Sequence, residues 1–370
     1  MATGDAQGTG ADLGLHPVNE AVPEGIDVPR VTEWLEREID GVARPFGFDL
    51  IAGGHSNLTF SVTDAAGRRI VLRRPPISHV LSTAHDMGRE HRIISALRDT
   101  PVPVAEALGF CEDASVNGAP FYVMDFVEGH ILRDSRSTEL ILSEDLRRSA
   151  GNDLVDVLVA IHTVNVDDVG LGDLGRREAY VARQLKRWNS QFQQSQAQES
   201  VGGFGRPAPL VSEVYDTLVE RMPPQQTSAI VHGDYRLDNT MIGDDGRVRA
   251  VLDWELCTLG EPLADLGTLH MYWSDRDETA NLPVVPTTAL PGFPTRRDLV
   301  ERYGSALRRD VSDLPYYVAF AHWRLACIIE GVYVRYAAGA MGGDPSAAAG
   351  FADMVIHQAE QARQALTALS

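Results

Sequence analysis

Two short segments constrain the fold of this chain more than any other feature of its sequence. They are His232–Asn239, which reads HGDYRLDN, and Val251–Glu255, which reads VLDWE. Apolar runs and a glycine-rich turn lie between them, so the sequence predicts a β-hairpin over 240–252. Because this hairpin would begin just after Asn239 and end just before Asp253, we expect these two side chains to lie at the same end of it.

The chemistry of this arrangement suits phosphoryl transfer. Magnesium prefers oxygen ligands and usually takes only one or two of them from protein, which makes Asn239 and Asp253 candidate magnesium ligands. The reaction also needs a base that orients the acceptor hydroxyl, and Asp234 is the candidate catalytic residue. The alternative is a polar loop before an ordinary hairpin. We favour catalysis, because H-G-D-x-x-x-x-N followed 14 residues later by an Asp at a strand end is more specific than a turn.

The two segments resemble the aminoglycoside phosphotransferase and choline kinase-like superfamily, and the resemblance runs from about residue 45 to the C-terminus. It implies an α+β, protein-kinase-like two-lobed fold, with a small antiparallel-sheet N-lobe and a mainly helical C-lobe. It also implies ATP (or, alternatively, GTP), Mg²⁺ and a small-molecule hydroxylated acceptor. The segment Arg73-Arg74-Pro75-Pro76 is most similar to the branch related to kinase domains fused to acyl-CoA dehydrogenases.

The predicted organisation is a flexible N-terminal arm over 1–28, an N-lobe over 29–127 and a C-lobe over 128–370. A chain of 370 residues exceeds the size at which one core usually stops growing. The patterns predict strands at 48–52, 58–63, 69–73, 105–111 and 121–127. They predict helices at 30–40, 86–98, 143–163, 174–198, 208–221, 261–274, 295–307 and 312–338.

A glycine-rich turn in the N-lobe is the first candidate for nucleotide binding. Its residues are Gly53, Gly54, His55, Ser56 and Asn57. Glycine lets the backbone approach phosphate closely, and neighbouring N–H and side-chain donors can bind it. A plain turn can have the same composition. We favour nucleotide binding because this segment precedes the other motifs in the chain.

An arginine and a glutamate form the second nucleotide candidate. Arg73 stands on a predicted strand where kinases commonly have a lysine that pairs with phosphates and with a helix glutamate. Glu90 shares a helical stripe with Met87, Ile94 and Leu97, and a carboxylate on a core-facing stripe needs a cation. We therefore pair Arg73 with Glu90. The alternative is that Arg73 is a solvated strand residue.

The resemblance supplies the third nucleotide candidate, the hinge strand that ends in Asp125, Phe126 and Val127. In the superfamily the backbone of this segment would bind adenine.

Several other residues have expected roles near the HGDYRLDN segment. His232 should brace the loop by hydrogen bonding, His162 should be a packed helix histidine, and Asp265 should cap or tie the loop. Arg324 and Glu330, on the predicted helix over 312–338, are candidates for contact with the acceptor.

The net charge and composition of the chain limit the classes of partner that we expect. The chain has 33 Lys and Arg against 52 Asp and Glu, a formal net charge of −19, which disfavours nucleic acid and anionic lipid as partners. Its three cysteines are far apart, no run of about 18 apolar residues exists, and no signal peptide is recognisable. We therefore expect a cytoplasmic protein that binds no membrane, as a monomer or homodimer. An aminoglycoside kinase proper and a catalytically weak nucleotide-binding pseudokinase remain alternatives.

Overall fold

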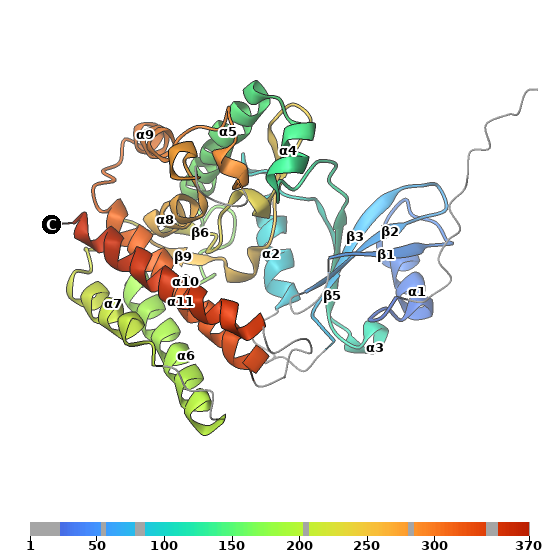
Figure 1. Cartoon of the computed structure of the whole chain (residues 1–370). Coiled ribbons are helices and arrows are strands. Elements are labelled where there is room, and N and C mark those ends of the chain that lie inside the picture. Colours follow the sequence, from blue (N-terminus) through green and yellow to red (C-terminus); the bar gives the residue numbers. More distant parts are fainter. Residues whose placement is uncertain are drawn as a thin grey trace, which may run out of the picture. The chain divides into compact units, whose positions relative to one another are not determined.

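The computed structural model describes residues 23–52, 57–77, 86–202, 207–279, 285–337 and 347–369. The chain divides into two compact units (Figure 1). The first comprises Met1–Gly88 and Leu108–Phe126, and the second comprises Arg89–Ala107 and Val127–Ser370. Residues 89–107 therefore pack with the helical unit, whereas the sequence groups them with the N-lobe. The functional lobe boundaries at 127 and 128 stay a proposal.

The first unit is built on a five-stranded sheet in the order β1-β2-β3-β5-β4, as predicted for a small antiparallel-sheet lobe. Helix α1 (Val28–Glu38) buries Val31, Trp34 and Leu35 in one core with residues of the sheet. The Trp34 ring meets Phe121 edge to face, 4.9 Å between centroids. The strands are β1 (Gly47–Ala52), β2 (Leu58–Thr63), β3 (Arg69–Arg74), β4 (Ala107–Cys111) and β5 (Phe121–Asp125), with a short helix α3 (Ala114–Asn117) before the last.

The end of the predicted arm belongs to this unit. Residues 1–22 lie outside the described residues, but Ile26 is buried in the core. The Asp27 side chain accepts a hydrogen bond from the Arg30 N–H and so caps α1. Helix α1 therefore begins at Val28, two residues earlier than predicted.

The second unit is mainly helical, as predicted. Its helices are α2 (Met87–Leu97, which begins at the boundary of the units), α4 (Ser135–Ile141), α5 (Glu144–Thr163), α6 (Tyr180–Gly202), α7 (Pro209–Glu220), α8 (Leu263–Tyr272), α9 (Arg296–Leu307), α10 (Leu314–Ala337) and α11 (Ala347–Thr367). Helices α10 and α11 run side by side, and α10 also packs on α8, α6 and α7 (Figure 1). Within the described segments, no helix has both the length and the apolar character needed to cross a bilayer.

Two of these helices were absent from the sequence prediction. Helix α4 is short and is capped by Asp134, whose carboxylate accepts from the Ser137 N–H at 2.9 Å. Helix α11 buries Val355, Ala359, Ala362 and Leu366. Their spacing is that of one helical face, so the signal for α11 was present in the sequence.

The second unit also contains two small two-stranded sheets, one of which is the predicted hairpin. Strand β6 (Ala229–Val231) pairs with β9 (Thr258–Gly260), and β7 (Thr240–Ile242) pairs with β8 (Val248–Val251), both antiparallel. The β7–β8 pair confirms the hairpin over 240–252. One-turn 3₁₀ helices at Leu237–Asn239 and Trp254–Leu256 flank it.

Candidate active site

The segment His232–Asn239, here called the 232–239 loop, follows β6 and closes on itself around Asp234. The Nδ2 atom of Asn239 donates to both the backbone carbonyl and the Oδ2 of Asp234, each at 2.9 Å. The Nε of Arg236 lies 3.3 Å from the same Oδ2. The Asp234 side chain keeps 25% of its surface exposed. The loop thus fixes the orientation of a carboxylate that solvent or a ligand can still reach.

Arg236 links this carboxylate to its neighbours. Its Nη1 lies 3.0 Å from Asp238 Oδ2, and its guanidinium stacks over the Tyr272 ring at 4.7 Å. Burial lowers the pKa of Arg236, but the carboxylates of Asp234 and Asp238 outweigh burial and hold that pKa above its ordinary value. Arg236 therefore stays cationic and offsets the repulsion between the two carboxylates.

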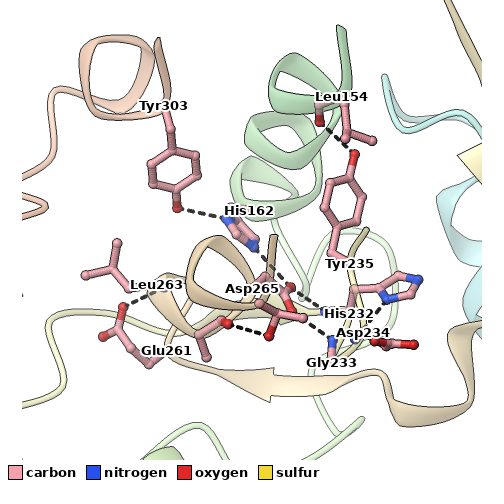
Figure 2. Close-up of polar contacts among 12 residues, drawn as sticks. Leu154, His162, His232, Gly233, Asp234, Tyr235, Glu261, Leu263, Asp265 and Tyr303 are labelled. Atoms are coloured by element: carbon pink, nitrogen blue, oxygen red, sulfur yellow. Dashed lines mark hydrogen bonds and ion pairs between the residues drawn. The ribbon is translucent and has the colours of Figure 1, made fainter. Parts of the chain in front are cut away.

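His232 braces the loop from behind, as predicted (Figure 2). Its Nδ1 accepts from the Asp234 N–H at 3.2 Å, and its Nε2 lies 2.9 Å from the Leu252 carbonyl. A ring that accepts at one nitrogen and donates at the other is the neutral tautomer, assigned here from the bonding network. Next to it, the buried Tyr235 hydroxyl donates to the Leu154 carbonyl on α5 at 2.7 Å.

A buried carboxylate on α8 ties the loop backbone (Figure 2). Asp265 accepts from the N–H groups of His232, at 2.6 Å, and Gly233, at 2.8 Å. The His162 Nε2 lies 3.3 Å from Asp265, and the His162 Nδ1 lies 2.8 Å from the Tyr303 hydroxyl. The predictions that Asp265 ties the loop and that His162 is a satisfied helix histidine are both confirmed.

The ionised state of Asp265 follows from these contacts. Burial by itself raises the pKa of this carboxyl. The hydrogen bond and charge of His162 and the hydrogen bond from the Gly233 N–H outweigh burial, so the pKa of Asp265 lies below its ordinary value.

Arg324 holds the other side of Gly233. Its Nη2 donates to the Gly233 carbonyl at 2.6 Å and lies 3.3 Å from Thr268 Oγ1. The Arg324 guanidinium thus holds the loop backbone, and its contact with the acceptor stays a prediction. Glu330 is also buried and accepts from Gln196. We call Asp265, His162 and Arg324 the buried anchor of the loop.

Gly233 itself is a position that requires glycine. Its φ of +89° is left-handed, and an added Cβ would lie 2.9 Å from both the Cβ and the carbonyl oxygen of Leu256. The backbone turn that presents Asp234 therefore depends on a residue without a side chain.

Asn239 and Asp253 lie at the same end of the hairpin. The Leu252 N–H donates to the Asn239 carbonyl at 2.9 Å, which places Asp253 one residue further on. Asp253 adopts a left-handed backbone, with φ 63° and ψ 66°. The Nδ2 of Asn239 is engaged by Asp234, so its amide oxygen is the atom available to a cation. An amide oxygen and a carboxylate are oxygen donors of the kind that magnesium takes from protein.

The candidates for nucleotide binding are only partly described. Gly53, Gly54, His55 and Ser56 lie outside the described residues. Asn57 is buried just before β2. Arg73 lies on β3, opposite Thr59 of β2 and Tyr122 of β5. Glu90 is buried on α2 with its stripe partners Met87, Ile94 and Leu97, as the helical pattern predicted.

The predicted hinge strand is two residues too long, since β5 ends at Asp125. The Arg68 Nη2 lies 3.1 Å from Asp125 Oδ1. The Arg69 guanidinium lies 3.8 Å above the centroid of the Phe126 ring. Val127 is the first residue of the second unit's longer segment. Binding of adenine by this backbone stays a proposal.

A cavity of about 230 Å³, which sequence reasoning missed, lies beside the 232–239 loop in the second unit. We call it the loop cavity. Its lining includes Arg133, Arg236, Asp238, Leu132, Tyr272 and Trp273. With Pro286, Thr287 and Thr288, the lining residues come from four separate stretches of chain, so no local sequence pattern predicts them.

Comparisons with known proteins agree with this geometry. Residues 48–299 match the sequence profile described as the phosphotransferase enzyme family. Acyl-CoA dehydrogenase family member 10 of Mus musculus is 33% identical over 292 residues, which covers 76% of this chain and 26% of that protein. Member 11 of Gallus gallus is 32% identical over 300 residues, or 78% of this chain and 36% of that protein. The chain thus spans about a quarter to a third of these relatives.

Solved structures share the fold. A Ralstonia eutropha protein, provisionally assigned as an aminoglycoside phosphotransferase, is 32% identical, with a TM-score of 0.74 over 91% of this chain and 98% of that one. Choline kinase from Cryptosporidium parvum has a TM-score of 0.62 at 12% identity, over 92% and 96% of the chains. The aminoglycoside phosphotransferase APH(4)-Ia, solved with AMP-PNP and hygromycin B, has a TM-score of 0.55 at 18% identity, over 89% and 98%. The predicted two-lobed kinase-like fold is confirmed.

Proposed function

The chain belongs to the phosphotransferase enzyme family, and from that membership we propose that it transfers the γ-phosphoryl group of ATP to a hydroxyl group of a small molecule, with Mg²⁺. The observation that supports this proposal most directly is the fixed orientation and partial exposure of the Asp234 carboxylate. Its Oδ2 is held by Asn239 and Arg236, while the side chain stays partly exposed. A fixed and accessible carboxylate is what a general base requires.

In the proposed reaction Asp234 acts through its second oxygen. Oδ1 accepts the hydrogen bond of the acceptor hydroxyl and takes its proton, as the hydroxyl oxygen bonds to the γ-phosphorus and the bond to ADP breaks. The bonds from Asn239 and Arg236 to Oδ2 keep the carboxylate aimed throughout. The buried anchor holds the loop backbone, so little reorganisation accompanies the transfer.

Asn239 and Asp253 would hold the magnesium ion. When bound, the ion neutralises phosphate charge. The nucleotide contacts would come from Gly53, Gly54, His55, Ser56, Asn57, Arg73, Glu90, Asp125, Phe126 and Val127. ATP is the favoured donor because the related APH(4)-Ia binds AMP-PNP, and GTP is the alternative.

The loop cavity is the proposed entrance for the acceptor, since Arg236 both lines it and touches Asp234. A cytoplasmic monomer or homodimer that binds neither nucleic acid nor membrane remains our expectation for the setting in which this reaction occurs.

A transfer assay tests the function. The chain would be incubated with γ-labelled ATP, Mg²⁺ and a library of hydroxylated acceptors, beside Asp234→Ala and the exposed control Asp216→Ala. Transfer should fall about 10²- to 10⁴-fold in Asp234→Ala, the usual contribution of a general base, and stay unchanged in the control. Full transfer by Asp234→Ala would exclude the mechanism. Nucleotide binding without transfer would favour a pseudokinase, and transfer confined to amino sugars would favour an aminoglycoside kinase.

A further inference from the structure

The loop cavity differs in charge from the chain as a whole. The chain carries a formal net charge of −19. The charged residues that line this cavity are two arginines, Arg133 and Arg236, and one acid, Asp238. The Asp238 carboxylate already lies 3.0 Å from the Arg236 guanidinium. The lining therefore offers no carboxylate that is not already paired with a cation.

Arg133 is the cation left over. In the part of the chain that the structure describes, its guanidinium has no ion pair or hydrogen bond. Arg236, in contrast, is engaged by two carboxylates. A guanidinium forms paired hydrogen bonds with carboxylate or phosphate oxygens, so Arg133 can take an anionic group without first giving up a protein partner.

The backbone that carries Arg133 is fixed at both ends. On one side, His130 forms an isolated bridge with Ile242 of β7, with N–H to carbonyl distances of 2.7 and 2.8 Å. On the other side, Leu132 is buried and Asp134 caps α4. Arg133 is exposed, but it is anchored on the same hairpin that follows the 232–239 loop.

The remaining lining is mainly apolar and aromatic. It includes Leu237, Leu269, Trp273 and Pro286, with Tyr272 stacked under Arg236. Such walls bind the hydrocarbon part of a ligand, while a few polar groups fix its orientation. An open groove between α5 and α9 is different, because Asp156, Asp298 and Glu301 there outnumber Arg148 and Arg302.

We propose that the loop cavity selects an acceptor that carries an anionic oxygen group, a carboxylate or a phosphate, on an apolar stem, and that Arg133 recognises this charge. The inference rests on the proposed function, since it gives that reaction the chemical class of its acceptor. A polycationic amino sugar would place ammonium groups near two guanidiniums, with no unpaired carboxylate in the lining to bind them. Arg133 is thus a specificity-determining residue.

Four matched probes test the charge preference. They are 6-hydroxyhexanoate, 6-hydroxyhexyl phosphate, 6-hydroxyhexanamide and 6-aminohexan-1-ol, which share a hydroxyl and a six-carbon chain and differ in charge. Calorimetry would measure their binding to the full chain with AMP-PNP and Mg²⁺, so that no turnover is needed. At least one anion should bind about tenfold tighter than the amide, as expected for one charge-assisted hydrogen bond, and the amine should bind most weakly. The order of the two anions identifies the preferred group.

Variants assign the preference to one side chain. Arg133→Gln should bind anion and amide equally, and Arg133→Glu should favour the amine. Arg136→Gln, an exposed arginine on α4 that does not line the cavity, should keep the wild-type order.

The proposal is overturned if the amine binds tightest, if charge makes no difference, if Arg133→Gln keeps the preference, or if AMP-PNP binds and no probe does. These outcomes are separable from failure of the proposed function. Full phosphoryl transfer by Asp234→Ala would refute the role of Asp234 as the base without affecting the charge preference of the loop cavity. Loss of the charge preference would refute the role of Arg133 without affecting the role of Asp234.

Discussion

The two sides of the 232–239 loop handle charge in opposite ways. Behind it, the buried anchor contains Asp265, which is 0% exposed, and Arg324, which is 6% exposed. In front, the side chains of Asp234, Arg236 and Asp238 keep 25%, 28% and 34% of their surface exposed. A buried charge is tolerated only with full hydrogen bonding, so the anchor has one stable arrangement. The front charges are partly hydrated and can exchange partners with a ligand. The comparison predicts that changes behind the loop lower stability and changes in front lower activity.

The largest expected effect comes from Asp234→Asn. The amide is nearly isosteric but cannot accept the acceptor's proton, so the transfer rate should fall about 10²- to 10⁴-fold. Unfolding by urea should show a free energy within about 1 kcal/mol of wild type, since the lost ion pair with Arg236 is partly exposed. A large loss of stability in this variant would show that the front of the loop is also structural.

Asp265→Asn should reverse this pattern. The amide keeps only one acceptor oxygen, so either the Gly233 N–H loses its partner, or the His232 N–H and His162 both lose theirs. We expect a loss of about 3–5 kcal/mol in the free energy of unfolding, the range for breaking a buried charged pair. Urea unfolding at neutral pH measures it, with the exposed Asp216→Asn as the control near zero.

The stability difference between wild type and Asp265→Asn should depend on pH. Because the folded-state pKa of Asp265 is lowered, its ionisation stabilises the fold above the unfolded pKa of about 3.9. That contribution is lost as the pH falls through the lower folded value. The stability difference between wild type and Asp265→Asn should therefore shrink below about pH 4. A difference that stays constant in melts down to pH 3 would contradict an ionised Asp265.

Gly233→Ala tests the left-handed backbone conformation of the residue that lies between the buried anchor and Asp234. A non-glycine residue at a left-handed φ, here with a close contact to Leu256, should destabilise the fold by about 1–3 kcal/mol. Because the strain sits directly before Asp234, the transfer rate should also fall. Gly67→Ala is the matched control, since that glycine has φ +83° and nothing near its Cβ position. Equal effects of both variants on activity would argue against a special role of Gly233.

Arg324→Lys should have the smallest effect. Both contacts of Arg324 come from its Nη2 atom. Lysine keeps the charge, but its shorter side chain does not bring the ammonium to the position of Nη2, so one hydrogen bond is lost, about 1–2 kcal/mol of stability. If Arg324 positions Asp234, kcat should fall while KM for the acceptor stays the same. A rise in KM alone would instead indicate that Arg324 contacts the acceptor.

The sequence predicts features that depend on residues close together in the chain better than features that depend on residues far apart in it. The hairpin over 240–252 and the buried stripe that includes Glu90 are local periodicities, and both are present. The sequence also predicts the roles of His232 and Asp265. The bracing role of His232 follows from the resemblance, which assigns the base to Asp234, and the hydrogen bonds of both residues to the loop are present.

Long-range contacts account for what the sequence does not show. Arg324 lies in a helix of aromatic residues whose spacing suggests a core, and no local signal shows that its guanidinium turns to a backbone carbonyl. The loop cavity joins segments around Leu132, Leu237, Leu269 and Thr287, which only the tertiary fold brings together. The stripe of α11 was readable, but its alanines are weakly apolar and made the pattern easy to miss.

The bond from Arg324 to Gly233 spans 91 positions of sequence. Arg324 also lies beyond residue 299, where the match to the family profile ends. A fragment excised at the limits of that match would contain the entire 232–239 loop and still lack the cation that bonds its carbonyl. During synthesis, likewise, the loop stays incomplete until α10 has left the ribosome and packed. Residues 48–299, by which the family is recognised, are therefore not sufficient to fix the orientation of Asp234. Helix α10 must fold with them, because it carries Arg324.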